Sequence, residues 1–204
     1  MLTGREPFYR TFAKCVARLA ACPLVLDLGT PEPFSDELSK LRQLFTRSRY
    51  VTMDYPFSTD PLAIDVAGDI HHLPFQDGVA DGVICKEVLE HVDNPFQAVE
   101  EIYRVIRPGG LLFLTVPFLE PYHGRHGSYE DYWRFTQAGI RRLLRRFRQV
   151  EVEMYGGVPY LLVTAYAPRL RRLLFSWGLG WLFWTVDRRF RRSSTILHMV
   201  LAEK

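Results

Sequence analysis

Cysteine is scarce in this chain, and its positions exclude two kinds of site. The 204 residues contain only three cysteines, Cys15, Cys22 and Cys85. They form no Cys-x-x-Cys pair and lie in apolar surroundings, so the sequence predicts neither a disulfide framework nor a zinc site. A reducing compartment fits this pattern best.

The sequence also lacks the apolar runs that export or membrane spanning requires. The first ten residues, MLTGREPFYR, carry charges and aromatic rings where a secretory signal has an unbroken apolar run. The mostly apolar segment Leu173–Val186 has fourteen residues. As a helix it would rise only about 21 Å, short of the roughly 30 Å hydrocarbon core of a bilayer. We therefore expect a cytoplasmic protein.

The composition is that of an ordinary globular protein, but charge is unevenly distributed along the chain. With 48% apolar and 24% charged residues, the chain can bury a sizeable core, and its length favours one domain over residues 1–204. Residues 1–140 hold 13 Lys and Arg against 19 Asp and Glu, whereas residues 141–204 hold 13 against 4. This basic end suggests nucleic acid, an anionic membrane surface or anionic substrates as a partner.

Short apolar, strand-like runs alternate with helical patterns, which is typical of an α/β protein with a parallel sheet covered on both faces. The predicted strands are 23–28, 50–54, 63–66, 82–85, 111–116, 150–155 and 196–202. The predicted helices are 35–45, 94–105 and 136–147.

Residues 156–195 form an unusually long connection between the last two predicted strands. This insert contains Leu173–Val186, with arginines on both sides and three tryptophans within it. Such a segment suits the headgroup region of an anionic membrane. It equally suits a helical cap on the sheet or a homodimer interface, and the sequence leaves these alternatives open.

Acidic residues follow the first two strands in an informative arrangement. The first strand ends in Asp27-Leu28-Gly29-Thr30, and the second ends at Asp54 about 25 residues later. A carboxylate at that position, beside the first strand-to-helix turn, can accept hydrogen bonds from both hydroxyls of a ribose. This implies a cofactor of the adenosine type.

Further segments follow in a consistent order: Gly68-Asp69-Ile70, then the run from Asp81 to Val92, then Arg107-Pro108-Gly109-Gly110 and the strand Leu112–Pro117. In this order and spacing, the sequence over residues 22–150 resembles the class I S-adenosylmethionine-dependent methyltransferases of the type 11 kind. The resemblance implies a Rossmann-like, seven-stranded, mostly parallel sheet with an antiparallel last strand, helices on both faces, and residues 156–195 as a helical insert.

The same resemblance implies roles for particular residues in binding S-adenosylmethionine. Asp54 would hold the ribose hydroxyls, and Asp69 with the Ile70 backbone would meet the adenine. Lys86 and Glu87 would line the methionine part. The first turn would supply Asp27, Gly29 and Thr30. Alternatively, Asp54 and Asp69 only form turns, and Glu87 and Glu90 lie on a solvated helix face.

The first turn departs from the family pattern, because only Gly29 remains of its three usual glycines and Pro31 and Pro33 occupy the other positions. Proline removes an N–H donor and restricts φ, so this turn is poorly suited to cradle a phosphate. That disfavours a dinucleotide enzyme. S-adenosylmethionine carries no phosphate, so it remains compatible with the turn.

The loop after the fifth strand, residues 117–136, is expected to cover the acceptor site. Its segment Asp131–Thr136 resembles a loop of methyltransferases associated with glycan or cell-surface polysaccharide synthesis. His126 and His123 are the candidate general bases for a hydroxyl acceptor, with Asp131 as the orienting group. His91 is an alternative base. For the end of this segment an ordinary packed loop is the favoured interpretation, in which Trp133 and Phe135 enter the core and Thr136 caps the next helix.

The sequence predicts no metal site, because the His-x-x-His spacing at His123 and His126 lies in a glycine-rich loop without a third ligand. The main hypothesis is a methyltransferase that acts on a small or lipid-linked acceptor, of which a glycan-containing molecule is one form. The enzyme would be located peripherally at the inner membrane surface. A non-catalytic relative that docks to a membrane or partner through its basic insert is the alternative. Nucleic-acid methylation is disfavoured, because the arginines flank a Trp- and Leu-rich segment instead of lining a polar groove.

Overall fold

The computed structural model describes residues 7–29, 43–55, 64–126, 128–157, 185 and 195–204. Thr30, Pro31 and Pro33 lie outside the described residues, as do most of the predicted helix 35–45 and nearly all of the Leu173–Val186 segment. The expectations about the proline-containing turn and the insert therefore stay predictions.

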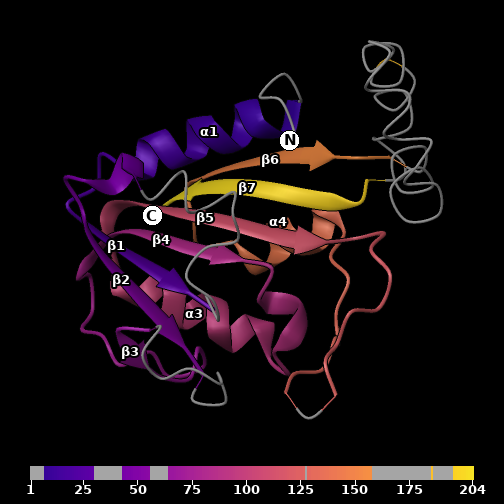
Figure 1. Ribbon diagram of the computed structural model, residues 1–204, viewed down its shortest axis with the longest axis horizontal. Coiled ribbons are helices and arrows are strands. Elements are labelled where there is room, and N and C mark those ends of the chain that lie inside the picture. The colour runs from indigo at the N-terminus through magenta and orange to yellow at the C-terminus, as the bar shows by residue number, and fades with distance from the viewer. Residues whose placement is uncertain (1–6, 30–42, 56–63, 127, 158–184, 186–194) are drawn as a thin grey trace.

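A seven-stranded sheet forms the centre of the molecule, in the order β3-β2-β1-β4-β5-β7-β6 (Figure 1). The neighbours among β1 to β5 pair in parallel, and β7 is antiparallel to both β5 and β6. This confirms the expected mostly parallel sheet with an antiparallel last strand. The strands are β1 (Leu24–Leu28), β2 (Arg49–Asp54), β3 (Val66–Ala67), β4 (Ala80–Lys86), β5 (Ile106–Pro117), β6 (Gln149–Tyr155) and β7 (Leu197–Glu203).

Helices cover both faces of the sheet (Figure 1). One face carries α1 (Pro7–Leu19), and the other carries α3 (Pro95–Val105) and α4 (Gln137–Leu143). The central strand β5 serves both layers because successive side chains alternate across a sheet. Phe113 packs against Phe12 of α1 with ring centroids 5.4 Å apart, while its neighbour Leu112 belongs to the core under α3 and α4.

The starts of α3 and α4 follow from capping residues in the sequence. The Asn94 side chain accepts a hydrogen bond from the Gln97 N–H at 3.2 Å, and Pro95 occupies the first turn. The Thr136 hydroxyl accepts from the Gly139 N–H at 3.0 Å. The expected capping role of Thr136 is confirmed, although α4 ends at Leu143, four residues before the predicted end.

Three further elements differ from the sequence prediction. β5 begins at Ile106, five residues before its predicted start. β3 covers only Val66–Ala67 instead of 63–66, because it is a short edge strand that pairs with the last two residues of β2. Helix α1 was not predicted, although Phe12, Val16 and Leu19 are buried at helical spacing. All three cysteines are free thiols, as expected. Among the described residues, no helix combines the length and the apolar character needed to cross a bilayer.

The buried histidine of β7 makes stability depend on pH. The His198 side chain is 2% exposed, and neither ring nitrogen has a hydrogen-bond partner among the described residues. Burial lowers the pKa of His198 to about 4. Below about pH 6.5 the unfolded chain therefore binds a proton at this histidine, whereas the folded chain binds it only near pH 4. The free energy of unfolding is highest above pH 6.5 and decreases as the pH falls below that value.

We predict that the free energy of unfolding falls by roughly 2 kcal/mol from this residue alone between pH 7 and pH 5. Urea titrations at both pH values measure it. His198→Leu should remove this contribution, whereas His126→Leu, at an exposed histidine, should keep it. Equal pH dependence in wild type and His198→Leu would contradict the prediction.

Candidate functional site

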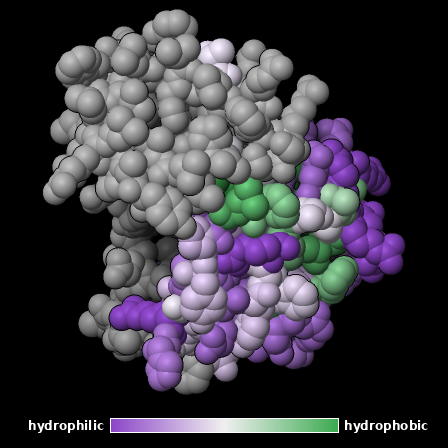
Figure 2. Space-filling view, turned by 90° about the vertical axis from the view of Figure 1, so that its right-hand side faces the viewer, coloured by the Kyte–Doolittle hydropathy of each residue, from purple (hydrophilic) through white to green (hydrophobic). Residues whose placement is uncertain are grey.

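The parallel strands end together at one edge of the sheet, which lies on the right in Figure 1 and faces the viewer in Figure 2. Open α/β sheets bind ligands outside this carboxyl edge. Figure 2 shows that hydrophilic side chains cover much of the described part of this face, around a smaller hydrophobic area. The residues predicted from the sequence can be followed around this edge strand by strand.

The turn after β1 needs a glycine for two independent reasons. Gly29 has φ +76°, which favours glycine, and its N–H donates to the Met53 carbonyl at 2.8 Å. A Cβ at this position would lie 2.3 Å from Cγ2 of Val88, beyond the end of β4. Asp27, just before it, is 2% exposed and accepts a hydrogen bond from the Tyr50 hydroxyl. The β1 turn and the β4 turn are thus in direct contact.

Asp54 is the last residue of β2 and lies next to that turn in the sheet. Its Oδ1 accepts the Tyr55 N–H at 2.7 Å. Its second oxygen accepts no hydrogen bond from the described residues. Burial raises the pKa of Asp54, and the backbone hydrogen bond opposes this only in part. A half-buried carboxylate with a free oxygen is suited to accept hydrogen bonds from ligand hydroxyls.

Asp69 and Ile70 follow β3 at the same edge. Asp69 Oδ1 accepts the His71 N–H at 2.8 Å and contacts His71 Nδ1 at 2.7 Å. Burial raises the pKa of Asp69, but the hydrogen bonds from His71 outweigh it, and the pKa lies below its ordinary value. Ile70 is 8% exposed and belongs to the core. Asp69 is therefore an ionised acceptor held by its own loop.

Lys86 and Glu87 form the end of β4. Glu87 has φ +54°, the only positive φ of a non-glycine residue in the described part of the chain. Its N–H donates to the Thr115 carbonyl at 3.0 Å, and Lys86 Nζ lies 3.9 Å from Glu87 Oε2. Backbone strain of this kind is typical of functional turns. It lies where the sequence predicts the methionine part of the cofactor.

The loop after β5 brings His123 and Asp131 together, as the sequence analysis proposed, and leaves His126 apart. The His123 N–H donates to Asp131 Oδ2 at 2.9 Å, and His123 Nδ1 is 3.3 Å from the same oxygen. Arg134 pairs with both oxygens of Asp131 at 2.5 and 2.6 Å. These Arg134 hydrogen bonds hold the pKa of Asp131 at about 2, against the effect of burial. His126 is exposed.

Glu90 is the site residue that the sequence analysis missed. Its side chain is 0% exposed, and neither carboxylate oxygen has a hydrogen-bond partner among the described residues. Burial, with smaller contributions from the nearby Glu87, Asp131 and Glu120, raises the pKa of Glu90 to about 8. The alternative from the sequence was a solvated helix face, but Glu90 lies in the short 3-10 helix η2 (Leu89–His91) and is buried there.

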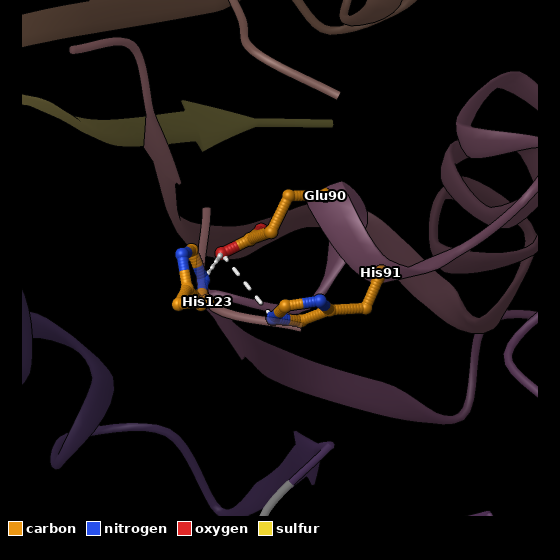
Figure 3. Close-up of side chains that lie close together, drawn as sticks. All are labelled: Glu90, His91 and His123. Carbon is orange, nitrogen blue, oxygen red and sulfur yellow. Dashed lines mark ion pairs between the residues drawn. The ribbon is translucent and has the colours of Figure 1, made fainter. Parts of the chain in front are cut away.

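Glu90, His91 and His123 converge in one cluster, hereafter the Glu90 cluster (Figure 3). Glu90 Oε1 lies 3.9 Å from His91 Nε2 and 3.8 Å from His123 Nε2. His91 Nδ1 bonds the Glu130 carbonyl at 2.7 Å, and burial lowers the pKa of His91. In the part of the chain that the structure describes, this is the only group of three such side chains with metal-binding spacing.

Backbone hydrogen bonds attach the loop after β5 to η2. The Tyr132 N–H donates to the Glu90 carbonyl at 2.7 Å, and the Trp133 indole N–H donates to the Val92 carbonyl at 2.8 Å. Trp133 is 42% exposed, so its expected place in the core is wrong, whereas Phe135 is buried at 6% as expected. The cluster is thus held between two segments that are fastened together.

A cavity of about 540 Å³ lies elsewhere, lined by charged side chains that include Glu100, Arg104, Arg146 and Lys204. These residues adjoin the start of β5 and the end of β7, away from the carboxyl ends of the parallel strands. None of the residues predicted from the sequence as site residues lines this cavity.

Comparisons with known proteins agree with the geometry of this edge. A family model described as a methyltransferase domain matches residues 34–114. Ubiquinone biosynthesis O-methyltransferase of Xanthomonas campestris is 32% identical over 104 residues, which cover 50% of this chain and 37% of that protein. The matched segments span well under two thirds of the length of the curated relatives.

Solved structures share the fold over almost the whole chain. An S-adenosylmethionine-dependent methyltransferase from Archaeoglobus fulgidus superposes with a TM-score of 0.62 at 14% identity, covering 96% of this chain and 92% of that chain. A Haemonchus contortus phosphoethanolamine N-methyltransferase in complex with S-adenosylmethionine gives 0.58 at 16% identity, covering 96% of this chain and 52% of that chain. The Rossmann-like fold is confirmed.

We predict that Gly29→Ala destabilises the fold more than Gly109→Ala does. Both glycines have nearly the same positive φ, +76° and +77°, so both variants carry a backbone cost of roughly 1–2 kcal/mol. Only Gly29→Ala adds a clash, with Val88, which costs about 1–3 kcal/mol more. A Cβ at Gly109 meets nothing within 4 Å. Urea unfolding measures both variants, and equal losses would refute the contact between the two turns.

Proposed function

We propose that this chain is an S-adenosylmethionine-dependent methyltransferase that acts on a hydroxyl group of a small or lipid-linked acceptor. The observation that carries the proposal is the series of ligand-suited groups along one sheet edge. The carboxyl ends of β1, β2, β3 and β4 carry, in that order, Gly29, Asp54, Asp69 and Glu87. The Glu90 cluster lies beyond them. When bound, the cofactor supplies a methyl group already activated by its sulfonium.

The described residues fit such a cofactor. Gly29 lets the turn after β1 pack against Val88 beyond the end of β4, because a Cβ at this position would clash with that side chain. Asp54 offers a carboxylate with one unengaged oxygen for ribose hydroxyls. Asp69 remains an ionised acceptor for the adenine amino group, beside the backbone of buried Ile70. Lys86 and Glu87 present opposite charges for a methionine carboxylate and ammonium group.

Two histidines in this site are prepared to accept a proton. His91 Nδ1 faces only a carbonyl oxygen, at 2.7 Å, so this nitrogen must carry the hydrogen and Nε2 is left as the acceptor. His123 Nδ1 faces the Pro121 carbonyl and Asp131 Oδ2, which imposes the same tautomer. Asp131 therefore orients His123, and His123 Nε2 can receive the proton of an acceptor hydroxyl. His126 stays a candidate base on the same loop.

The acceptor in this proposal is an oxygen on a small or lipid-linked molecule. The similarity to a protein named as a ubiquinone biosynthesis O-methyltransferase favours an oxygen acceptor on a small or lipid-linked molecule. Exposed aromatic side chains on the loop after β5, Tyr122, Tyr129, Tyr132 and Trp133, offer surfaces for a ring or a sugar. A glycan-containing acceptor is the narrower form of this proposal. The competing function is a non-catalytic relative, which would bind neither the cofactor nor its product.

We predict that Asp54→Ala lowers the affinity for S-adenosylmethionine by roughly 10- to 100-fold, because hydrogen bonds to a charged group contribute about 1.5–3 kcal/mol. Isothermal titration calorimetry with S-adenosylmethionine and S-adenosylhomocysteine measures the change. The matched control is Asp77→Ala, at an exposed aspartate that pairs with Arg104 beside the remote cavity. Absence of binding to the wild-type chain would favour the non-catalytic alternative.

We further propose a peripheral location at an anionic membrane surface, supported by the apolar, arginine-flanked sequence of Leu173–Val186. Deleting this segment should abolish sedimentation with anionic liposomes and leave the affinity for S-adenosylmethionine within a few-fold. A homodimer interface is the other assignment for this segment. Liposome binding that survives the deletion would contradict the membrane assignment, and a dimer that dissociates because of the deletion would support the dimer interface.

A further inference from the structure

The carboxylate of Glu90 lacks any visible compensation for its burial. Its side chain is 0% exposed, and neither oxygen has a hydrogen-bond partner among the described residues. Buried polar atoms in folded proteins are almost always paired, and an unpaired buried carboxylate calls for a further partner such as an ion. The carboxylate points towards two imidazole nitrogens (Figure 3). The missing partner therefore belongs between these three groups.

Neutral imidazoles at these positions present lone pairs to Glu90. In the neutral form of His91 and His123, the acceptors at Nδ1 place the ring hydrogen on the far side, and each Nε2 carries a lone pair. Three electron-rich atoms then face one another, with Nε2–Oε1 distances of 3.9 and 3.8 Å. A proton shared with one of these atoms or a cation between them removes this repulsion, and a metal ion satisfies all three atoms at once.

The distances suit a metal ion. All three donor atoms lie within 4.8 Å of one another. With bonds of about 2.1 Å, two ligands of one ion can be at most about 4.2 Å apart. The separations of 3.8 and 3.9 Å from Glu90 Oε1 fall within this limit. Small side-chain rotations would complete the coordination.

The surroundings have the features of an outer ligand shell. Metal-binding histidines usually donate the other ring N–H to a carbonyl or a carboxylate, which fixes the ring and the tautomer. His91 does so to the Glu130 carbonyl, and His123 does so towards Pro121 and Asp131. Glu87, Glu120 and Asp131 add negative charge around Glu90. This field attracts a cation.

We propose that Glu90, His91 and His123 bind one divalent first-row transition metal ion. Two imidazoles and one carboxylate with open coordination positions favour ions such as Mn²⁺, Fe²⁺, Co²⁺ or Zn²⁺ over Mg²⁺, which prefers oxygen ligands alone. The sequence analysis considered only the pair His123 and His126 and predicted no metal. The proposed ligands come from two segments more than thirty residues apart.

The role of the ion rests on the proposed function, whereas its binding does not. An ion at the Glu90 cluster would hold the acceptor hydroxyl at an open coordination position and favour its ionised form, with the proton passing to water. His123 Nε2 would then be a ligand, and the ion would replace it in activating the hydroxyl. Asp131 would be a positioning residue that holds His123.

The test uses the full chain, first freed of metal by a chelator and then titrated with Mn²⁺, Co²⁺, Zn²⁺ and Mg²⁺ by calorimetry. One transition metal ion should bind per chain, at least about 10-fold more tightly than Mg²⁺. The visible absorption spectrum of the Co²⁺ form should show the bands of nitrogen-containing coordination. Elemental analysis after gel filtration gives the stoichiometry.

Three variants separate ligands from neighbours. Glu90→Gln keeps the shape of the buried side chain and should weaken Co²⁺ binding by about 100-fold or more. Asp131→Asn, which changes the contacts of Asp131 with His123 and Arg134 but removes no ligand, should weaken it roughly 10- to 100-fold. His126→Ala, on the same loop but outside the cluster, should bind Co²⁺ with unchanged affinity. Thermal unfolding of each metal-free variant verifies that it is folded.

The outcomes distinguish this proposal from the proposed function. A wild-type chain that binds S-adenosylmethionine but none of the four ions overturns the metal site and leaves the methyltransferase proposal intact. A wild-type chain that binds Co²⁺ but not S-adenosylmethionine overturns the methyltransferase proposal and leaves the metal site intact. Equal Co²⁺ affinity in wild type and folded Glu90→Gln also overturns the assignment of ligands. Methyl transfer that is unchanged in metal-free protein overturns the role of the ion in activating the acceptor.

Discussion

The pairing of β4 with β1 on one side and β5 on the other is the constraint on which the whole site depends. The register aligns Leu28 with Cys85 and Cys85 with Leu114, so the three strands end at nearly the same level. The turn at Gly29, the strained residue Glu87 and the loop after β5 consequently share one edge. Because the β1 turn touches Val88 at the next turn, these segments cannot be displaced independently.

Electrostatics divides this edge into two parts with different tasks. Asp54 and Asp69 lie towards β2 and β3, where each makes local hydrogen bonds and keeps capacity to accept more from a polar ligand. The Glu90 cluster lies towards β5, where acidic side chains outnumber basic ones and Arg134 is already paired with Asp131. The first part suits a nucleoside, and the second suits a cation together with an acceptor oxygen.

Much of the fold could be predicted because its signals are local. Short apolar runs indicated five of the seven strands to within about two residues at each end, and Asn94 and Thr136 marked the starts of two helices. β5 begins five residues before its predicted start. β3 was placed less accurately because its two residues are defined by pairing with β2 and not by their own pattern. Within the site, the sequence predicted the pairing of His123 with Asp131 correctly. Residue type alone could not show that His126 lies apart from them or that Trp133 is exposed and outside the core.

The sequence by itself determined the sheet class, the glycine turn and the acidic residues at the strand ends, because hydrophobic periodicity and chain order suffice to place them. Only the tertiary structure decided that Glu90 is buried and faces His91 and His123. Burial depends on what packs around a residue, and here the cover comes from a loop more than thirty residues away. That loop is held by hydrogen bonds from Tyr132 and Trp133 to η2 and the residue that follows it, contacts that no local pattern encodes.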